Sequence, residues 1–96
     1  MLKQKEIMLT DYVKQVEGNI VSDMGGEKVM LSIENGKYYN LGESGGAIWG
    51  LIESDVKVKE VITRLTELYE VEQKECEEQV VAFLNHLLNE GLVKIV

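Results

Sequence analysis

Ser44 lies in the segment GESGG, residues 42–46, which fits the G-x-S-x-G pattern of a serine nucleophile at a strand-to-helix turn. Such a nucleophile belongs to a large parallel-sheet fold that supplies an Asp and a His later in the chain, and 96 residues are too few for that fold. The same segment lacks the lysine and the full spacing of a phosphate-binding loop. We therefore expect no catalysis at this junction.

The single cysteine and the single histidine are also poor candidates for chemistry. Cys76 is flanked by Glu75, Glu77 and Glu78, whose charges disfavour a reactive thiolate, so we interpret Cys76 as a packing residue. His86 has no second His or Cys at metal-ligand spacing and is expected on a helix surface. The sequence thus predicts a protein that is not an enzyme and needs no metal or cofactor.

The length, composition and net charge of the chain limit the kinds of partner that it can bind. A chain of 96 residues with 45% hydrophobic residues predicts one globular domain over residues 1–96, in which residues 1–10 form a loose arm or a partial strand. There is no signal peptide and no apolar run of roughly 18 residues, and one cysteine cannot form an internal disulfide, so we expect a cytoplasmic protein. A net charge of −7 argues against nucleic acid and anionic membranes, which leaves a peptide or protein partner.

Three strand-like segments precede the helices, at residues 20–23, 28–33 and 37–41. Gly25-Gly26 and Asn35-Gly36 separate them, and both dipeptides are typical of two-residue hairpin loops. A two-residue loop at Asn35-Gly36 places Ile33 opposite Tyr38. In such a meander the third strand is an edge, whose outer N–H and C=O groups are unpaired.

Apolar residues at helical spacing predict three helices, at about residues 44–53, 57–69 and 73–90, with Gly91 as the terminator of the last. The remaining tail, residues 92–96, is extended or irregular. The fold class is therefore α+β, a three-stranded antiparallel sheet followed by three helices.

The first helix contains Gly45, Gly46 and Gly50, each of which costs about 0.5–1 kcal/mol relative to alanine. We expect these glycines to let the helix start abruptly after the strand and pack closely beneath it. The alternative is that Gly45 and Gly46 merely form a loose first turn.

The segment YYNL, residues 38–41, followed by Gly45 and by Ile48-Trp49, resembles the PqqD-like family of precursor-peptide recognition domains. Phe83-Leu84, Leu87 and Gly91-Leu92 match the closing pattern of that family, so the resemblance covers about residues 20–93. The phrasing GKYYNL…IW is most similar to the standalone leader-binding proteins of lasso-peptide pathways. Many relatives have Asn where this chain has Gly42, so Ser44 is the substitute expected to cap the first helix.

The resemblance implies a winged-helix-like domain that binds the leader segment of a ribosomally made precursor peptide and presents it to a leader peptidase. A cyclase of the same pathway is a further candidate partner. The leader is expected to add as a strand to the edge segment. The residues expected to contact it there are Lys37, Tyr38, Tyr39, Asn40 and Leu41.

The third helix is the other expected wall of the peptide site. Its apolar stripe is wider than one core-facing side needs, and the surplus predicts either a peptide groove or a dimer contact. The residues assigned to the peptide on this helix are Cys76, Val80, Val81, Phe83, Leu84 and Leu88.

Two other functions remain open at this stage. Within the family, the chain could carry the peptide substrate of a radical SAM enzyme, as in quinone-cofactor biosynthesis. In a different class, a winged-helix regulator could bind DNA, although glutamates at the start of the third helix would then face phosphates.

Overall fold

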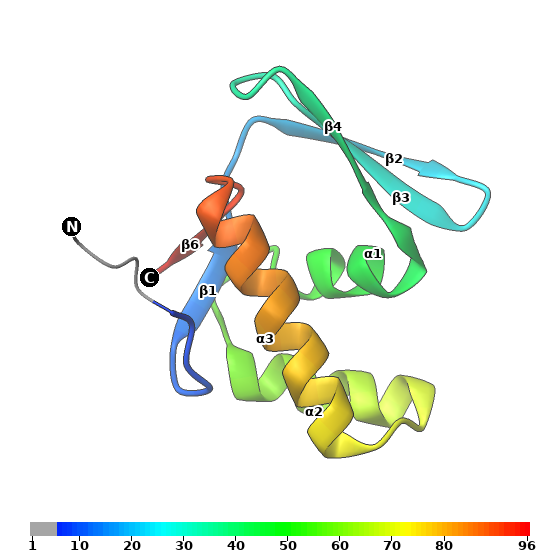
Figure 1. Cartoon of the computed structure of the whole chain (residues 1–96), viewed down its shortest axis with the longest axis vertical. Helices are drawn as coiled ribbons and strands as arrows, with labels where there is room; N and C mark the ends of the chain where they lie inside the picture. Colours follow the sequence, from blue (N-terminus) through cyan, green and yellow to red (C-terminus); the bar gives the residue numbers. More distant parts are fainter. Residues whose placement is uncertain (1–5) are drawn as a thin grey trace.

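A computed structural model describes residues 6–96 of the chain. Two small sheets and three helices make up the fold (Figure 1). The strands are β1 (Tyr12–Gln15), β2 (Asn19–Met24), β3 (Glu27–Ser32), β4 (Lys37–Leu41), β5 (Val56–Lys57) and β6 (Val93–Ile95). The helices are α1 (Gly42–Leu51), α2 (Val58–Tyr69) and α3 (Gln73–Asn89).

The larger sheet is the predicted antiparallel meander, with strand order β2-β3-β4. Gly25 and Gly26 connect β2 to β3 as a two-residue loop, and both have the positive φ (68° and 91°) that such a loop requires. The α+β class and the three-stranded sheet followed by three helices are therefore confirmed, in an arrangement consistent with a winged-helix-like domain.

The predicted pairing of the third strand is wrong by two residues. Leu31, not Ile33, lies opposite Tyr38, and Ile33 to Gly36 form a four-residue loop. The Gly36 N–H donates to the Ser32 carbonyl at 2.9 Å, and the Asn35 N–H donates to Ser32 Oγ at 3.1 Å. The Ser32 side chain and carbonyl thus close a longer loop than the Asn-Gly dipeptide predicts.

A second sheet, with strand order β5-β1-β6, was not predicted. Its strands are two, four and three residues long, too short to show an alternating pattern in the sequence. Strand β1 pairs antiparallel with both neighbours and therefore ties the N-terminal part of the chain to its C-terminal tail. The tail described as extended or irregular is β6.

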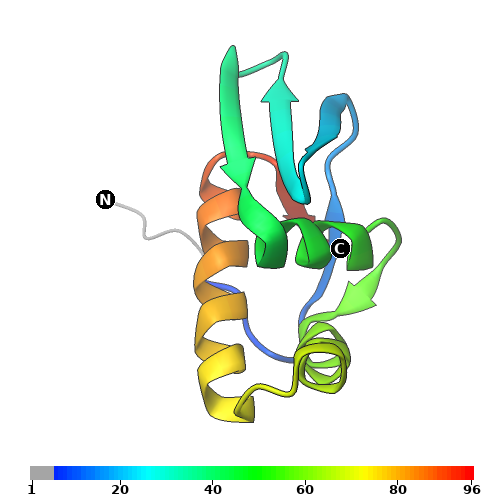
Figure 2. The ribbon, with the colours of Figure 1, turned by 90° about the vertical axis from the view of Figure 1, so that its right-hand side faces the viewer.

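Helix α1 lies directly beneath the larger sheet, whereas α2 lies at the end of the molecule away from that sheet and packs against α3, as the turned view shows (Figure 2). Their bounds agree with the predicted ranges to within about two residues, and Gly91 follows α3 with a φ of 76°. The core joins all three helices to one face of each sheet. It includes Val13, Met30, Ile52, Val58, Val61, Leu84, Leu87 and Leu92.

The glycines at the start of α1 allow close packing, as expected. A Cβ on Gly45 would lie 2.9 Å from two ring atoms of Phe83, and a Cβ on Gly46 would collide with the Lys28 side chain. Gly50, in contrast, faces open space. The expected Ser44 cap is wrong: α1 begins at Gly42, and the Asn40 Oδ1 accepts from the Gly42 N–H at 2.9 Å.

Residues 6–10 run along α3 before β1 begins. Ile7 is only 4% exposed, and its N–H donates to Asn85 Oδ1 on α3 at 2.8 Å. Val81 lies beside this segment and lines a shallow hollow together with Ile7 and Leu9. The N-terminal segment therefore covers part of the surplus apolar surface of α3; residues 1–5, the rest of the predicted arm, lie outside the described range.

Candidate peptide-binding groove

The outer edge of β4 offers backbone groups from alternate residues. Because the loop at Gly25-Gly26 has two residues, the residues on either side of it, Met24 and Glu27, form a hydrogen-bonded pair. Every second residue of β3, counted from Glu27, therefore forms its backbone hydrogen bonds with β2. The alternate residues of β3, which include Met30 and Ser32, form their backbone hydrogen bonds with β4, where their partners are Tyr39 and Lys37. It follows that Tyr38 and Asn40 direct their N–H and C=O groups away from the sheet, at an edge that no described strand pairs.

The side chains of β4 alternate between two environments. Tyr39 and Leu41 lie on the face of the sheet that carries the buried Met30 and Ser32, toward the helices. Tyr38 is on the opposite face and is 75% exposed. Tyr38 and Tyr39 therefore lie on opposite faces of the sheet.

A hydrogen-bonded cluster around Glu90 ties β4 to the end of α3. The Tyr39 hydroxyl donates to Glu90 Oε1 at 2.7 Å, and Lys37 Nζ lies 3.8 Å from the same oxygen. Asn35 Nδ2 donates to the Glu90 carbonyl at 2.8 Å. The Tyr39 hydrogen bond, with the charges of Lys37 and His86, lowers the pKa of Glu90 despite partial desolvation. This cluster, Asn35, Lys37, Tyr39 and Glu90, fixes one end of β4 relative to α3.

The residues assigned to the peptide on α3 do not share one face. Val80 and Leu84 are buried, at 1% and 0% exposure, so they belong to the core beneath the groove. Phe83 is half-buried and faces Gly45 of α1. Val81 is turned toward the N-terminal segment, and Leu88, seven residues later and so on the same side of the helix, is partly buried against the core. The structure thus brings Phe83 close to α1 and the end of β4, and it places Cys76 against α2 at the other end of the hollow.

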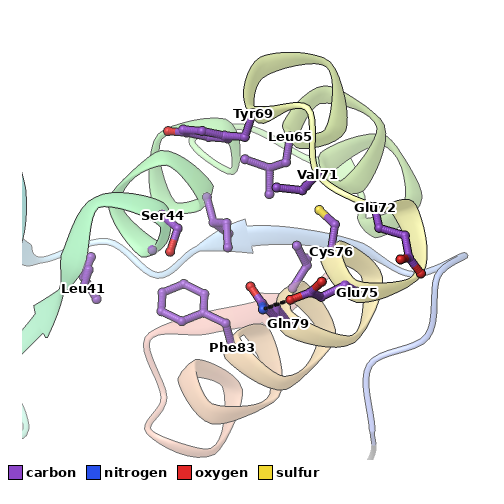
Figure 3. A pocket seen from close by; sticks show the side chains of 13 residues that line it. Leu41, Ser44, Leu65, Tyr69, Val71, Glu72, Glu75, Cys76, Gln79 and Phe83 are labelled. Atoms are coloured by element: carbon purple, nitrogen blue, oxygen red, sulfur yellow. Dashed lines mark hydrogen bonds between the residues drawn. The ribbon is translucent and has the colours of Figure 1, made fainter.

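A hollow of about 530 Å³ opens where β4 ends, between α1, α2 and α3 (Figure 3). Leu41 and Phe83 lie at its β4 end, and the Cys76 sulfur points into it. Burial raises the pKa of the Cys76 thiol, so this wall is neutral and apolar. The other lining residues are Ser44, Gly45, Ile48, Leu65, Tyr69, Val71, Glu72, Glu75, Gln79 and Val80.

Several polar residues of this site were not predicted from the sequence, because single polar residues form no recognisable pattern. Asn35 and Glu90 are 55 residues apart, and nothing in the sequence links them. Gln79 could have been found, since it lies four residues before Phe83 on the same side of α3. His86 is exposed, and no group of three or more His, Cys, Asp or Glu within residues 6–96 is placed to hold a metal.

Comparison with known proteins places this geometry in a family. Residues 27–93 match the family described as Coenzyme PQQ synthesis protein D (PqqD). The chain belongs to the PqqD family, which confirms the resemblance found in its sequence. No match is found among curated protein sequences. Within residues 6–96, no helix is both long and apolar enough to cross a membrane.

Two solved structures are similar over most of the chain. One is TbiB1 in complex with the TbiA(beta) leader peptide, with 26% identity, a TM-score of 0.75, and coverage of 84% of this chain and 94% of the other. The second is the PqqD truncation of Methylobacterium extorquens PqqCD, a stand-alone recognition element for ribosomally synthesised and post-translationally modified peptides. It has 16% identity and a TM-score of 0.77, and covers 92% of this chain and 94% of its own.

Proposed function

We propose that this protein binds the leader segment of a ribosomally made precursor peptide and presents it to a maturation enzyme without doing chemistry itself. The leader adds as a fourth strand to β4 and lies against α3. In the favoured version the enzyme is a leader peptidase of a lasso-type pathway, with a cyclase as a further partner, and the protein acts in the cytoplasm.

The observation that carries this proposal is the unpaired β4 edge beside an apolar helix. Tyr38 and Asn40 present backbone donors and acceptors in the spacing of a strand, and main-chain bonds of this kind hold an extended peptide. Phe83 supplies apolar contact along the same path. TbiB1, a similar structure, is in complex with a leader peptide, which supports the same use of this chain.

Presentation to an enzyme needs a second surface, and the outer face of the larger sheet is suited to it. Ile20, Met24 and Tyr38 are exposed there, at 52%, 64% and 75%. Exposed apolar clusters of this kind mark protein interaction sites. A leader strand added to β4 would extend this same sheet, so a partner docked on the outer face would contact the protein and the leader together. We assign this face to the maturation enzyme.

Two alternatives are weaker. Membership of the PqqD family also fits a carrier for the peptide substrate of a radical SAM enzyme, which differs only in the enzyme served. A DNA-binding regulator fits poorly, because the net charge is −7 and exposed glutamates, Glu75 and Glu78, lie in the first turns of α3.

A direct titration separates these classes. Labelled leader segments of precursors encoded by neighbouring open reading frames, and a labelled DNA duplex, are titrated with the protein while fluorescence anisotropy is measured. We expect saturable binding of one leader in the micromolar range or tighter and none of the duplex. Duplex binding that weakens steeply with salt, without leader binding, would contradict the proposal.

A further inference from the structure

The hollow at the end of β4 has no occupant among the described residues, although much of its wall is apolar. Leu41, Ile48, Leu65 and Phe83 form that wall, and Tyr69 and Val71 extend it as exposed side chains, at 42% and 45%. A volume of about 530 Å³ lies within the range of small-ligand pockets, and it is large enough to admit a bulky side chain. Its position continues the β4 edge, since Leu41 is the last residue of β4 and lines the hollow.

Charge distinguishes this hollow from a purely apolar cavity. Glu75 lies at its margin, within 3.4 Å of Gln79 Nε2, and Glu72 precedes it on the same side of α3. Among residues 6–96, no Lys or Arg lines the hollow, so the carboxylates give its mouth a negative potential. Figure 3 shows Glu75 and Gln79 together beside the cavity, opposite Ser44.

We infer that this hollow is a specificity pocket for a leader in which a bulky apolar residue stands next to a Lys or Arg. The apolar side chain fills the space between α1 and α3, and the cation lies at the mouth beside Glu75. This inference rests on the proposed function and defines which leaders the β4 edge selects. Main-chain pairing alone holds extended peptides with little discrimination, so a side-chain pocket must supply it.

The direction in which the leader runs along β4 follows from the strand pairing within the sheet. Both pairs within the β2-β3-β4 sheet are antiparallel, and antiparallel pairing is the more stable kind. A leader antiparallel to β4 passes Leu41 with its N-terminal part. The apolar residue and its basic neighbour therefore precede the strand-forming segment in the leader.

The test uses a display library of random 16-residue peptides selected on the whole protein, followed by affinity measurements on the selected peptides. We expect them to carry a bulky apolar residue with Lys or Arg within about two positions, upstream of a β-prone segment. Ser44→Phe, which fills the mouth from an exposed position, should weaken them about tenfold or more, because burial of such a side chain contributes at least that factor.

Two charge-reversal variants serve as a test and its matched control. Glu75→Lys should weaken the selected peptides by about three- to tenfold, an effect that shrinks as salt rises. Glu78→Lys makes the same charge change one turn further along α3, outside the hollow and beside the N-terminal segment, and should leave binding within about twofold of the parent.

The failure of the pocket and the failure of the proposed function give different results. If selected peptides lose affinity with Asn40→Pro but not with Ser44→Phe or Glu75→Lys, the β4 edge binds peptides and the pocket inference is wrong. If Glu75→Lys and Glu78→Lys weaken binding equally, only the net charge matters and the pocket inference is again wrong. A library that yields no binder sensitive to Asn40→Pro contradicts both.

Discussion

At the scale of single residues, Glu90 is the point that connects the β3–β4 hairpin to α3. Its carboxylate accepts from Tyr39 and its carbonyl accepts from Asn35. Because Tyr39 belongs to the edge strand, this cluster sets where the leader-binding edge lies relative to the helix. These contacts are exposed or only partly buried, so each contributes modestly to stability, and together they position β4.

The Glu90 cluster predicts a specific acid dependence. The folded-state pKa of Glu90 is lowered, so its stabilising contribution is complete above its unfolded pKa of about 4.3. That contribution is lost as the pH falls through the lower folded-state value. We expect Glu90→Gln to lower the melting temperature at pH 7, and we expect this difference from the parent to shrink as the pH falls through the folded-state pKa, measured by circular dichroism.

Tyr39→Phe is the partner variant, since it removes the largest cause of the lowered pKa. Its melting temperature should also approach that of the parent in acid. A Glu90→Gln effect that keeps its size across an acid titration until the parent itself unfolds would show that the ionised carboxylate is not what stabilises the cluster.

At the scale of elements, α3 has three sides with different tasks. Val80, Leu84 and Leu87 face the core, Phe83 and Gln79 face β4 and the hollow, and Val81 faces the N-terminal segment. This division explains why its apolar stripe is wide without requiring a dimer.

Two truncations separate the two outer sides of α3. Phe83→Ala should weaken leader binding about tenfold or more, because Phe83 lines the hollow beside Gly45. Val81→Ala should instead destabilise the fold by about 1 kcal/mol and leave leader affinity unchanged. Titration and denaturant unfolding measure the two effects. If Val81→Ala reduces affinity while stability stays at the parental value, the groove lies on the N-terminal side of the helix.

How well the sequence predicts the fold differs from one element to the next. Apolar residues at helical spacing located α1, α2 and α3, because each helix buries one side against the core. The β3–β4 register was misjudged because Ser32 and Asn35 make contacts that a local Asn-Gly rule cannot include. The N-terminal cover on α3 could not be foreseen, since Ile7 and Asn85 meet only through the tertiary fold.

At the scale of the whole molecule, the edge of β4 and the outer face of its sheet form two adjoining surfaces. In the proposed function the edge binds the leader, and the exposed apolar face is the surface that meets an enzyme. Glycines at the start of α1 support this layout, because Gly45 and Gly46 let the helix pack directly against Phe83 and Lys28.

The two surfaces should be separable by mutation. Ile20→Glu, on the strand farthest from β4, should leave leader affinity unchanged and slow processing of the precursor by the co-encoded peptidase about tenfold or more. Leu68→Glu is the control, since it places the same charge on an equally exposed apolar residue of α2. Equal processing rates for both variants would exclude the outer face as the enzyme's docking surface.

Strand addition is tested most directly by amide hydrogen exchange, measured by NMR with and without saturating leader. Tyr38 and Asn40 should exchange at least about tenfold more slowly in the complex, because their N–H groups become paired with the leader. Val21 and Asp23, which occupy the corresponding outward positions on the opposite edge strand β2, should be unaffected. Unchanged exchange at Tyr38 and Asn40 in a saturated complex, or new protection at Val21 and Asp23 instead, would contradict leader binding at β4.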